Sequence, residues 1–168
     1  MKIAGIEYYS DCNGSGFRNV LFISGCWHSC RKYCHNKQVQ DPNFGEEKTI
    51  DEVIKLLNKK NNKNITISGG DGLTYQVKNT IELVKTLKEK YNKNIWLYTG
   101  YKFEELLKDN IRKEVLKYVD VIVDNNFNPI LAKENPHPLF RGDIGQKIID
   151  VQKSLKQNKI IEWDDNIR

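Results

Sequence analysis

The sequence contains no hydrophobic run long enough to cross a membrane. Of its 168 residues, 39% are hydrophobic and 29% are charged, and no apolar run approaches the roughly 20 residues that a membrane-spanning helix requires. The first five residues, Met1-Lys2-Ile3-Ala4-Gly5, lack the apolar core of a secretory signal peptide. These absences predict a folded protein of the cytoplasm.

Basic tracts, internal repeats and low-complexity segments are also missing. The formal net charge is +5, but the lysines are scattered along expected helices, which favours solvated helix surfaces over a nucleic-acid footprint. We therefore expect no nucleic acid and no membrane as partners. The length favours a single domain over residues 1–168 with one core. The scattered lysines include Lys55, Lys59, Lys60, Lys85, Lys88 and Lys90.

Cysteine is scarce, yet three of the four cysteines lie within nine residues. In a chain without an export signal, such clustering indicates metal binding before it indicates disulfides. Three thiolates can hold an iron–sulfur cluster that keeps one iron open. A zinc site completed by His28 or His35 is the alternative that the residues alone leave open. Cys12 lies apart, and we expect an ordinary thiol there. The clustered cysteines are Cys26, Cys30 and Cys34.

Strands and helices are expected to alternate along the chain. A capping box at Thr49 and Glu52 predicts a helix to about Lys60, and helical spacing recurs from Val77 and from Phe103. Strands are expected at 20–25, 65–68, 95–98, 119–124 and 147–151. The segment 125–145, rich in Asn, Pro and Gly, is expected to be a long loop.

This alternation predicts an α/β fold of mostly parallel strands joined by right-handed crossovers. About five units are too few for a closed eight-stranded barrel, so we expect a partial, open (βα) barrel. In such folds the site lies at the carboxyl ends of the strands. The cysteine loop, the turn Gly69-Gly70-Asp71 and the turn at Thr99 all follow expected strands.

The cysteine segment 26–37 follows a strand ending Phe22-Ile23-Ser24-Gly25, and Asn36-Lys37 comes one residue after its last cysteine. This arrangement resembles the cluster loop of the radical S-adenosylmethionine (SAM) superfamily. The nearest likeness is to the activating proteins of anaerobic ribonucleoside-triphosphate reductases. Further segments similar to that family occur in the family's order at 13–18, 68–71, 95–101, 119–124, 140–142 and 146–151.

The resemblance implies a radical SAM oxidoreductase that generates a glycyl radical on the large subunit of an anaerobic ribonucleoside-triphosphate reductase. The cysteine trio would hold a [4Fe-4S] cluster, an electron donor such as flavodoxin or ferredoxin would reduce it, and the cluster and SAM would carry the chemistry without a catalytic side chain. A turn-forming role is the alternative for the Gly-Gly-Asp segment and for the threonine. The residues implied in SAM binding are Asn36, Gly69, Gly70, Asp71 and Thr99.

Four departures from the family pattern stand out. The cysteines are separated by three and three residues, where the family has three and two. Gly72 replaces a proline, Asn125 replaces a glycine, and the segment 143–145 replaces a more polar Ser-Ser-Asn. With the added residue, the longer loop must still bring all three sulfur atoms to one cluster. We expect Asn125 to preserve its turn, because asparagine tolerates left-handed backbone better than most residues.

Several side chains near these segments have two expected roles. Trp27 and Tyr33 either shield the cluster loop or simply pack, and His28 and His35 either hydrogen-bond around the cluster or face solvent. Arg18 is expected to contact SAM or a partner protein, or else to form a surface ion pair.

Other functions compete with the activase. They are a small-molecule radical SAM enzyme similar to 7-carboxy-7-deazaguanine synthase, a pyruvate formate-lyase activase, and a non-enzymatic zinc module. The segments 96–101 and 140–142 resemble the reductase activases more closely. The cluster loop, the SAM turns and their helices account for almost the whole chain. Few residues are left to enclose a small molecule, which favours a protein as the substrate.

Overall fold

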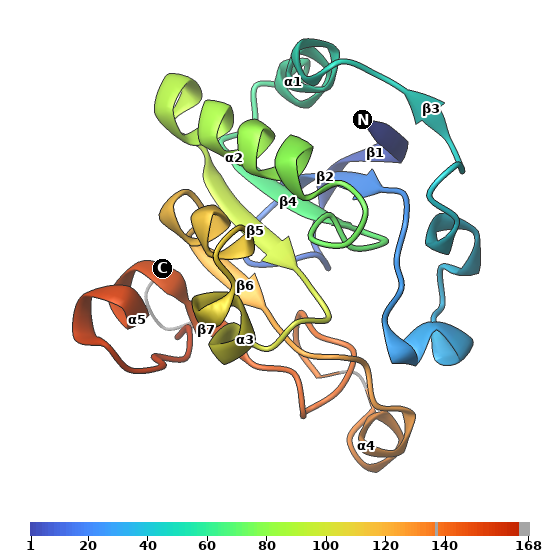
Figure 1. Ribbon diagram of the computed structural model, residues 1–168, viewed down its shortest axis with the longest axis vertical. Coiled ribbons are helices and arrows are strands. Elements are labelled where there is room, and N and C mark those ends of the chain that lie inside the picture. Colours follow the sequence, from blue (N-terminus) through green and yellow to red (C-terminus); the bar gives the residue numbers. More distant parts are fainter. Residues whose placement is uncertain (137, 165–168) are drawn as a thin grey trace.

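The structure, a computed structural model, describes residues 1–136 and 138–164. In this part of the chain the strands form one open seven-stranded sheet with the order β3-β1-β2-β4-β5-β6-β7 (Figure 1). The strands are β1 (Lys2–Ser10), β2 (Arg18–Ile23), β3 (Glu46–Glu47), β4 (Asn64–Gly69), β5 (Asn94–Tyr98), β6 (Val121–Val123) and β7 (Ile148–Asp150).

The centre of the sheet is parallel and its flanks are antiparallel. Strands β2, β4, β5 and β6 pair in parallel, whereas β1 and β7 run antiparallel to their inner neighbours. The carboxyl ends of four strands therefore meet at one edge. The expectation of an α/β fold with an open sheet is confirmed.

The α-helices are α1 (Ile50–Asn58), α2 (Val77–Tyr91), α3 (Phe103–Lys108), α4 (Pro129–Glu134) and α5 (Val151–Gln157). Three 3₁₀ helices are η1 (Ser29–Tyr33), η2 (Lys37–Gln40) and η3 (Arg112–Lys117). The predicted capping box starts α1: the Thr49 hydroxyl accepts from the Glu52 N–H at 3.2 Å, and the Glu52 carboxylate accepts from the Thr49 N–H at 2.7 Å. None of the described helices is long and apolar enough to span a membrane.

Alternate residues of the strands supply two separate cores. On one face, Leu21, Ile67 and Leu97 are fully buried, and α1, α2 and η3 cover this side (Figure 1). On the other face, Trp96 packs with Val121 and Val123. This period of two is the normal pattern of strands buried on both faces.

Some sequence-based boundaries were wrong. The strand expected at 147–151 ends at Asp150, because the Asp150 carboxylate accepts from the Lys153 N–H and so caps α5. The segment 125–145 holds the short helix α4, whose cap is the Asn128 side chain accepting from the Ile130 N–H at 3.0 Å. Strand β1 had no counterpart among the expected elements.

Candidate functional site

A cavity of about 380 Å³ lies at the carboxyl edge of the parallel strands. Its walls include every residue that the sequence assigned to the cluster and to SAM. Cys12 lies outside it and lines a different hollow with Tyr98 and Arg141. The assigned residues in the cavity walls are Cys26, Cys30, Cys34, Asn36, Gly69, Gly70, Asp71 and Thr99.

The cysteine loop is held against η2 by its backbone. The Gly25 N–H donates to the Val39 carbonyl at 2.7 Å, and the Cys26 N–H donates to the Gln40 carbonyl at 3.1 Å. The next residues form the 3₁₀ turn η1, in which the Cys34 N–H donates to the Arg31 carbonyl at 3.2 Å. The longer spacing between the second and third cysteines is thus taken up in one surface turn.

Partial burial favours the protonated form of two of the three thiols. Burial raises the pKa of Cys26 to about 11 and also raises the pKa of Cys30, while the His28 N–H acts in the opposite direction on the Cys26 sulfur. The Asn36 N–H donates to the Cys34 sulfur at 3.3 Å. Without a metal the raised pKa values of Cys26 and Cys30 favour the thiol form, so an iron cluster has to displace their protons on binding.

The donor set fits a cluster better than a single ion. Three thiols share one cavity, and no fourth cysteine lines it, which suits a cluster with an open iron. Within residues 1–136 and 138–164, no group of three histidine, cysteine or acidic side chains, the cysteine trio included, is arranged to hold a single metal ion. His28 is engaged by Asp71, and His35 packs edge-on against Phe127. The zinc alternative gains no support from this geometry.

Asp71 ties three turns of the site together. The side chain is only 2% exposed. Its Oδ2 lies 2.6 Å from His28 Nε2 and accepts from the Gly100 N–H at 2.9 Å, and its Oδ1 accepts from the Leu73 N–H at 2.8 Å. Thr99 donates its hydroxyl to the same Oδ2 at 2.8 Å. One carboxylate therefore fixes the cysteine loop and the turns after β4 and β5.

Close approach explains two of the glycines. Gly69 has φ +99°, and a Cβ there would lie 2.7 Å from the Ile23 backbone nitrogen. A Cβ on Gly100 would lie 2.5 Å from the His28 ring. A side chain at Gly69 would push β4 away from the end of β2, and one at Gly100 would push the turn after β5 away from the cysteine loop. The Thr99 hydroxyl also accepts from the Tyr101 N–H at 3.2 Å, the contact of a turn-capping residue.

Sequence reasoning missed part of the cavity wall. The segment after β6 supplies Asn126, whose Oδ1 accepts from the Cys30 thiol at 3.4 Å, and Phe127. The expected left-handed turn is present at Asn125, with φ +75°. The sequence could have pointed to these residues, because they come just after the segment 119–124, which resembles the family and is a predicted strand. His28, which the sequence left between two roles, is buried at 9% exposure.

Both expectations for Arg18 were wrong. It is 1% exposed and does not line the cavity. Its guanidinium donates to the Ile65 and Asn94 carbonyls at 2.8 and 3.0 Å, at the amino ends of β4 and β5. Because β2 begins at this residue, its side chain lies at the opposite end of the strands from the site.

Comparison with known proteins agrees with the site. Residues 12–149 match the family described as 4Fe-4S single cluster domain. The chain is 37% identical over 141 residues to a protein of Enterobacteria phage T4, covering 81% of this chain and 85% of that protein. It is 33% identical over 152 residues to a Pasteurella multocida protein, covering 85% and 94%. An Escherichia coli K12 protein is 36% identical over 143 residues, covering 81% and 90%.

All three relatives carry the same name, anaerobic ribonucleoside-triphosphate reductase-activating protein. The likeness spans most of both chains in each case, and the family match over residues 12–149 includes the cysteine loop and the turns that line the cavity. The chain therefore belongs to the family of anaerobic ribonucleoside-triphosphate reductase-activating proteins and carries a 4Fe-4S single cluster domain.

Proposed function

We propose that this protein is a radical SAM activase that generates a glycyl radical on an anaerobic ribonucleoside-triphosphate reductase. The observation that carries the proposal is the single cavity in which the three clustered cysteines meet the turns after β4 and β5. Membership of the activating-protein family supports it. The open sheet, with its site at the carboxyl edge, supports a partial (βα) barrel of the radical SAM type within one domain.

In this proposal Cys26, Cys30 and Cys34 hold the cluster. The backbone N–H groups of His28 and Asn36 point at sulfur atoms, so they stabilise thiolate charge once iron has displaced the protons. When bound, the cluster and SAM together supply a radical that abstracts hydrogen, and the protein supplies orientation and exclusion of water.

SAM would lie against the backbone of Gly69 and Gly70 and near Asn36, which all line the cavity. Asp71 and Thr99 have a different role, because their side-chain oxygen atoms already form hydrogen bonds with other residues of the protein. We assign them to holding the two turns that SAM contacts, rather than to binding SAM through free oxygen atoms.

The substrate in this proposal is a glycine-bearing segment of the reductase large subunit, working in the cytoplasm. The cavity wall formed by Asn126, Phe127 and Gly142 belongs to the segment after β6. A polypeptide reaching the cavity would meet this wall.

The test is electron paramagnetic resonance spectroscopy without oxygen. The reconstituted and reduced protein is mixed with SAM and the cognate reductase, and a glycyl doublet on the reductase is expected. SAM cleavage without a doublet would refute the activase function and favour a small-molecule radical SAM enzyme. Stoichiometric zinc and no bound iron would instead refute the radical SAM assignment.

A further inference from the structure

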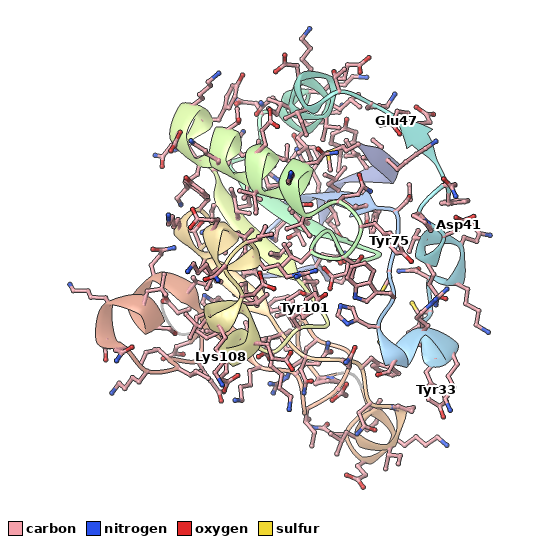
Figure 2. The ribbon with its side chains drawn as sticks, in the orientation of Figure 1. Tyr33, Asp41, Glu47, Tyr75, Tyr101 and Lys108 are labelled. Carbon is pink, nitrogen blue, oxygen red and sulfur yellow. The ribbon has the colours of Figure 1, made fainter. Side chains whose placement is uncertain are left out.

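An exposed group of aromatic side chains lies beside the cysteine loop. Trp27 is 45% exposed and Tyr75 is 50% exposed. We call Trp27, Tyr75, Tyr101 and Arg112 the aromatic patch. Figure 2 shows Tyr75 and Tyr101 at the sheet edge, near the loop that carries Tyr33. Aromatic and arginine side chains are the residue types that most often dominate protein interfaces.

The patch is ordered by its own contacts. The rings of Trp27 and Tyr75 meet edge to face with centroids 5.0 Å apart, and Trp27 Nε1 donates to the Tyr101 hydroxyl at 3.1 Å. The Arg112 guanidinium lies 4.8 Å from the centroid of Tyr101 and donates to the Leu73 carbonyl at 2.7 Å. Such a preorganised surface loses little side-chain entropy on binding a partner.

The patch backs onto the cavity without belonging to it. None of its four residues lines the cavity, but Trp27 directly follows Cys26. The His28 ring, which does line the cavity, packs edge-on against Tyr101 with centroids 4.7 Å apart. A protein seated on the patch would come close to the cluster while the cavity itself stayed open for SAM and the reductase.

The charges around the patch favour an acidic partner. Two of the three acidic side chains nearby pair with cations, Asp109 with Arg112 at 2.7 Å and Glu104 with Lys147 at 3.6 Å, and Glu105 accepts from the backbone N–H of Lys102. In contrast, Lys102 and Lys108 are exposed and form no ion pair with a described residue. Lys78, beside Tyr75 in a small surface hollow, adds a third such cation.

We propose that the aromatic patch and its rim of lysines are the docking surface for a small acidic electron-transfer protein that reduces the cluster. The proposal rests on the proposed function, because it requires the cluster. In the step itself, one electron leaves the reduced flavin or iron–sulfur centre of the carrier and enters the oxidised cluster, and no bond forms or breaks. Encounters of this kind use small interfaces that depend strongly on charge.

The experiment measures how fast reduced flavodoxin, and in parallel reduced ferredoxin, reduces the reconstituted protein in an anaerobic stopped-flow instrument. The variants are Tyr75→Ala and Lys108→Glu. Each has a matched control on the helices away from the patch: Tyr91→Ala, at the far end of α2 with 47% exposure, and Lys55→Glu, on α1. Dithionite reduction serves as the reference, because a small anion needs no docking surface.

We expect the patch variants to lower the second-order rate constant with at least one carrier by about tenfold. The control variants and the dithionite rates should stay unchanged, as should iron content. Rates for the unmodified protein should fall with added salt. Unchanged carrier rates in both patch variants would overturn the proposal, and so would a selective loss of reductase binding in Tyr75→Ala.

Failure of this inference is distinguishable from failure of the proposed function. If dithionite-reduced protein forms the glycyl doublet on the reductase while the patch variants keep normal carrier rates, the activase function stands and the docking surface is wrong. If dithionite-reduced protein forms no doublet, the activase function fails regardless of the carrier rates.

Discussion

Asp71 and Arg18 are buried charges at opposite ends of the same parallel strands, with exposures of 2% and 1%. Asp71 collects donors from three turns at the carboxyl edge. Arg18 collects acceptors at the amino edge, from Thr66, the Ile65 carbonyl and Asn94. Asp71 accepts from backbone N–H groups and the Thr99 hydroxyl and lies 2.6 Å from His28 Nε2, and Arg18 donates to carbonyl and side-chain oxygen atoms, so both buried groups are satisfied by several hydrogen bonds, as burial requires.

The two ends differ in what surrounds the charge. The Arg18 guanidinium lies 5.2 Å from the centroid of the Trp96 ring, and burial lowers its pKa to about 10, so it stays charged at neutral pH. Trp96 in turn packs edge-on against Phe140 and Trp163. That end is filled by side chains, whereas the turns that Asp71 joins surround a cavity. We infer that one network serves the fold and the other serves the site.

The largest effect is expected on bound iron when one of the proposed cysteine ligands is removed. Cys30→Ala should remove most of the roughly four irons that the reconstituted protein binds, measured by iron and sulfide analysis. The cluster-free variant should unfold in urea with a free energy within about 0.5 kcal/mol of the cluster-free parent, because the thiol is only half-buried. Cys12→Ala is the control and should keep its iron, since that thiol lies outside the cavity. Retained iron in Cys30→Ala would contradict the ligand assignment.

Breaking the opposite network should damage stability. Arg18→Met keeps the aliphatic stem but leaves the buried Ile65 carbonyl and the partly buried Asn94 carbonyl without their guanidinium donor. Each loss costs about 1–3 kcal/mol, so the free energy of unfolding should fall by about 3–5 kcal/mol. Urea denaturation of the cluster-free protein measures it. Folded Arg18→Met should still bind iron, and a specific loss of iron without a loss of stability would contradict the division of roles.

Asp71→Asn should affect both properties. The amide keeps the shape, but an NH₂ group in place of Oδ2 would face the Thr99 hydroxyl and the Gly100 N–H, which already donate. We expect unfolding to become easier by about 2–3 kcal/mol and iron retention during gel filtration to fall severalfold. SAM affinity per retained cluster should change little. A selective loss of SAM binding, with stability and iron unchanged, would show that Asp71 contacts SAM directly.

The smallest effect is expected from restoring the family spacing in the cysteine loop. Lys32 lies in the surface turn η1, where its Nζ sits 4.7 Å from the centroid of the Tyr33 ring. Deleting Lys32 should leave iron content level or raise it, because Lys32 is exposed on the surface turn. Iron analysis and SAM cleavage assays measure the outcome. A complete loss of iron would show that the site is built around the longer loop.

The edge that carries the site could be predicted because its signals are local. A strand of β-branched residues that ends in glycine, followed by a helical period, places Cys26, Gly69 and Thr99 at strand ends without any knowledge of distant contacts. The capping box at Thr49 works in the same way, since both partners lie within four residues. The common direction of the central strands then brings these turns together.

The roles of the buried polar residues could not be predicted in this way. Arg18 donates to groups 47 and 76 residues away, and His28 meets Asp71 across 43 residues. Nothing local distinguishes a buried arginine from a surface one, so the sequence favoured an ion pair or a ligand contact. The cap of α4 at Asn128 was local, but the surrounding Asn, Pro and Gly residues obscured it.

By itself, the sequence determined the types of the central strands and of the helices between them, the edge to which the predicted site residues belong, and the family, because each depends on short periodic patterns or on motifs in order. Only the tertiary structure decided which polar groups serve the site and which serve the fold. A hydrogen bond joins atoms that the chain path brings within about 3 Å, and that path depends on the packing of the whole sheet. The different roles of Asp71 and Arg18 therefore depend on the pairing of β2, β4 and β5, which brings their hydrogen-bond partners within reach.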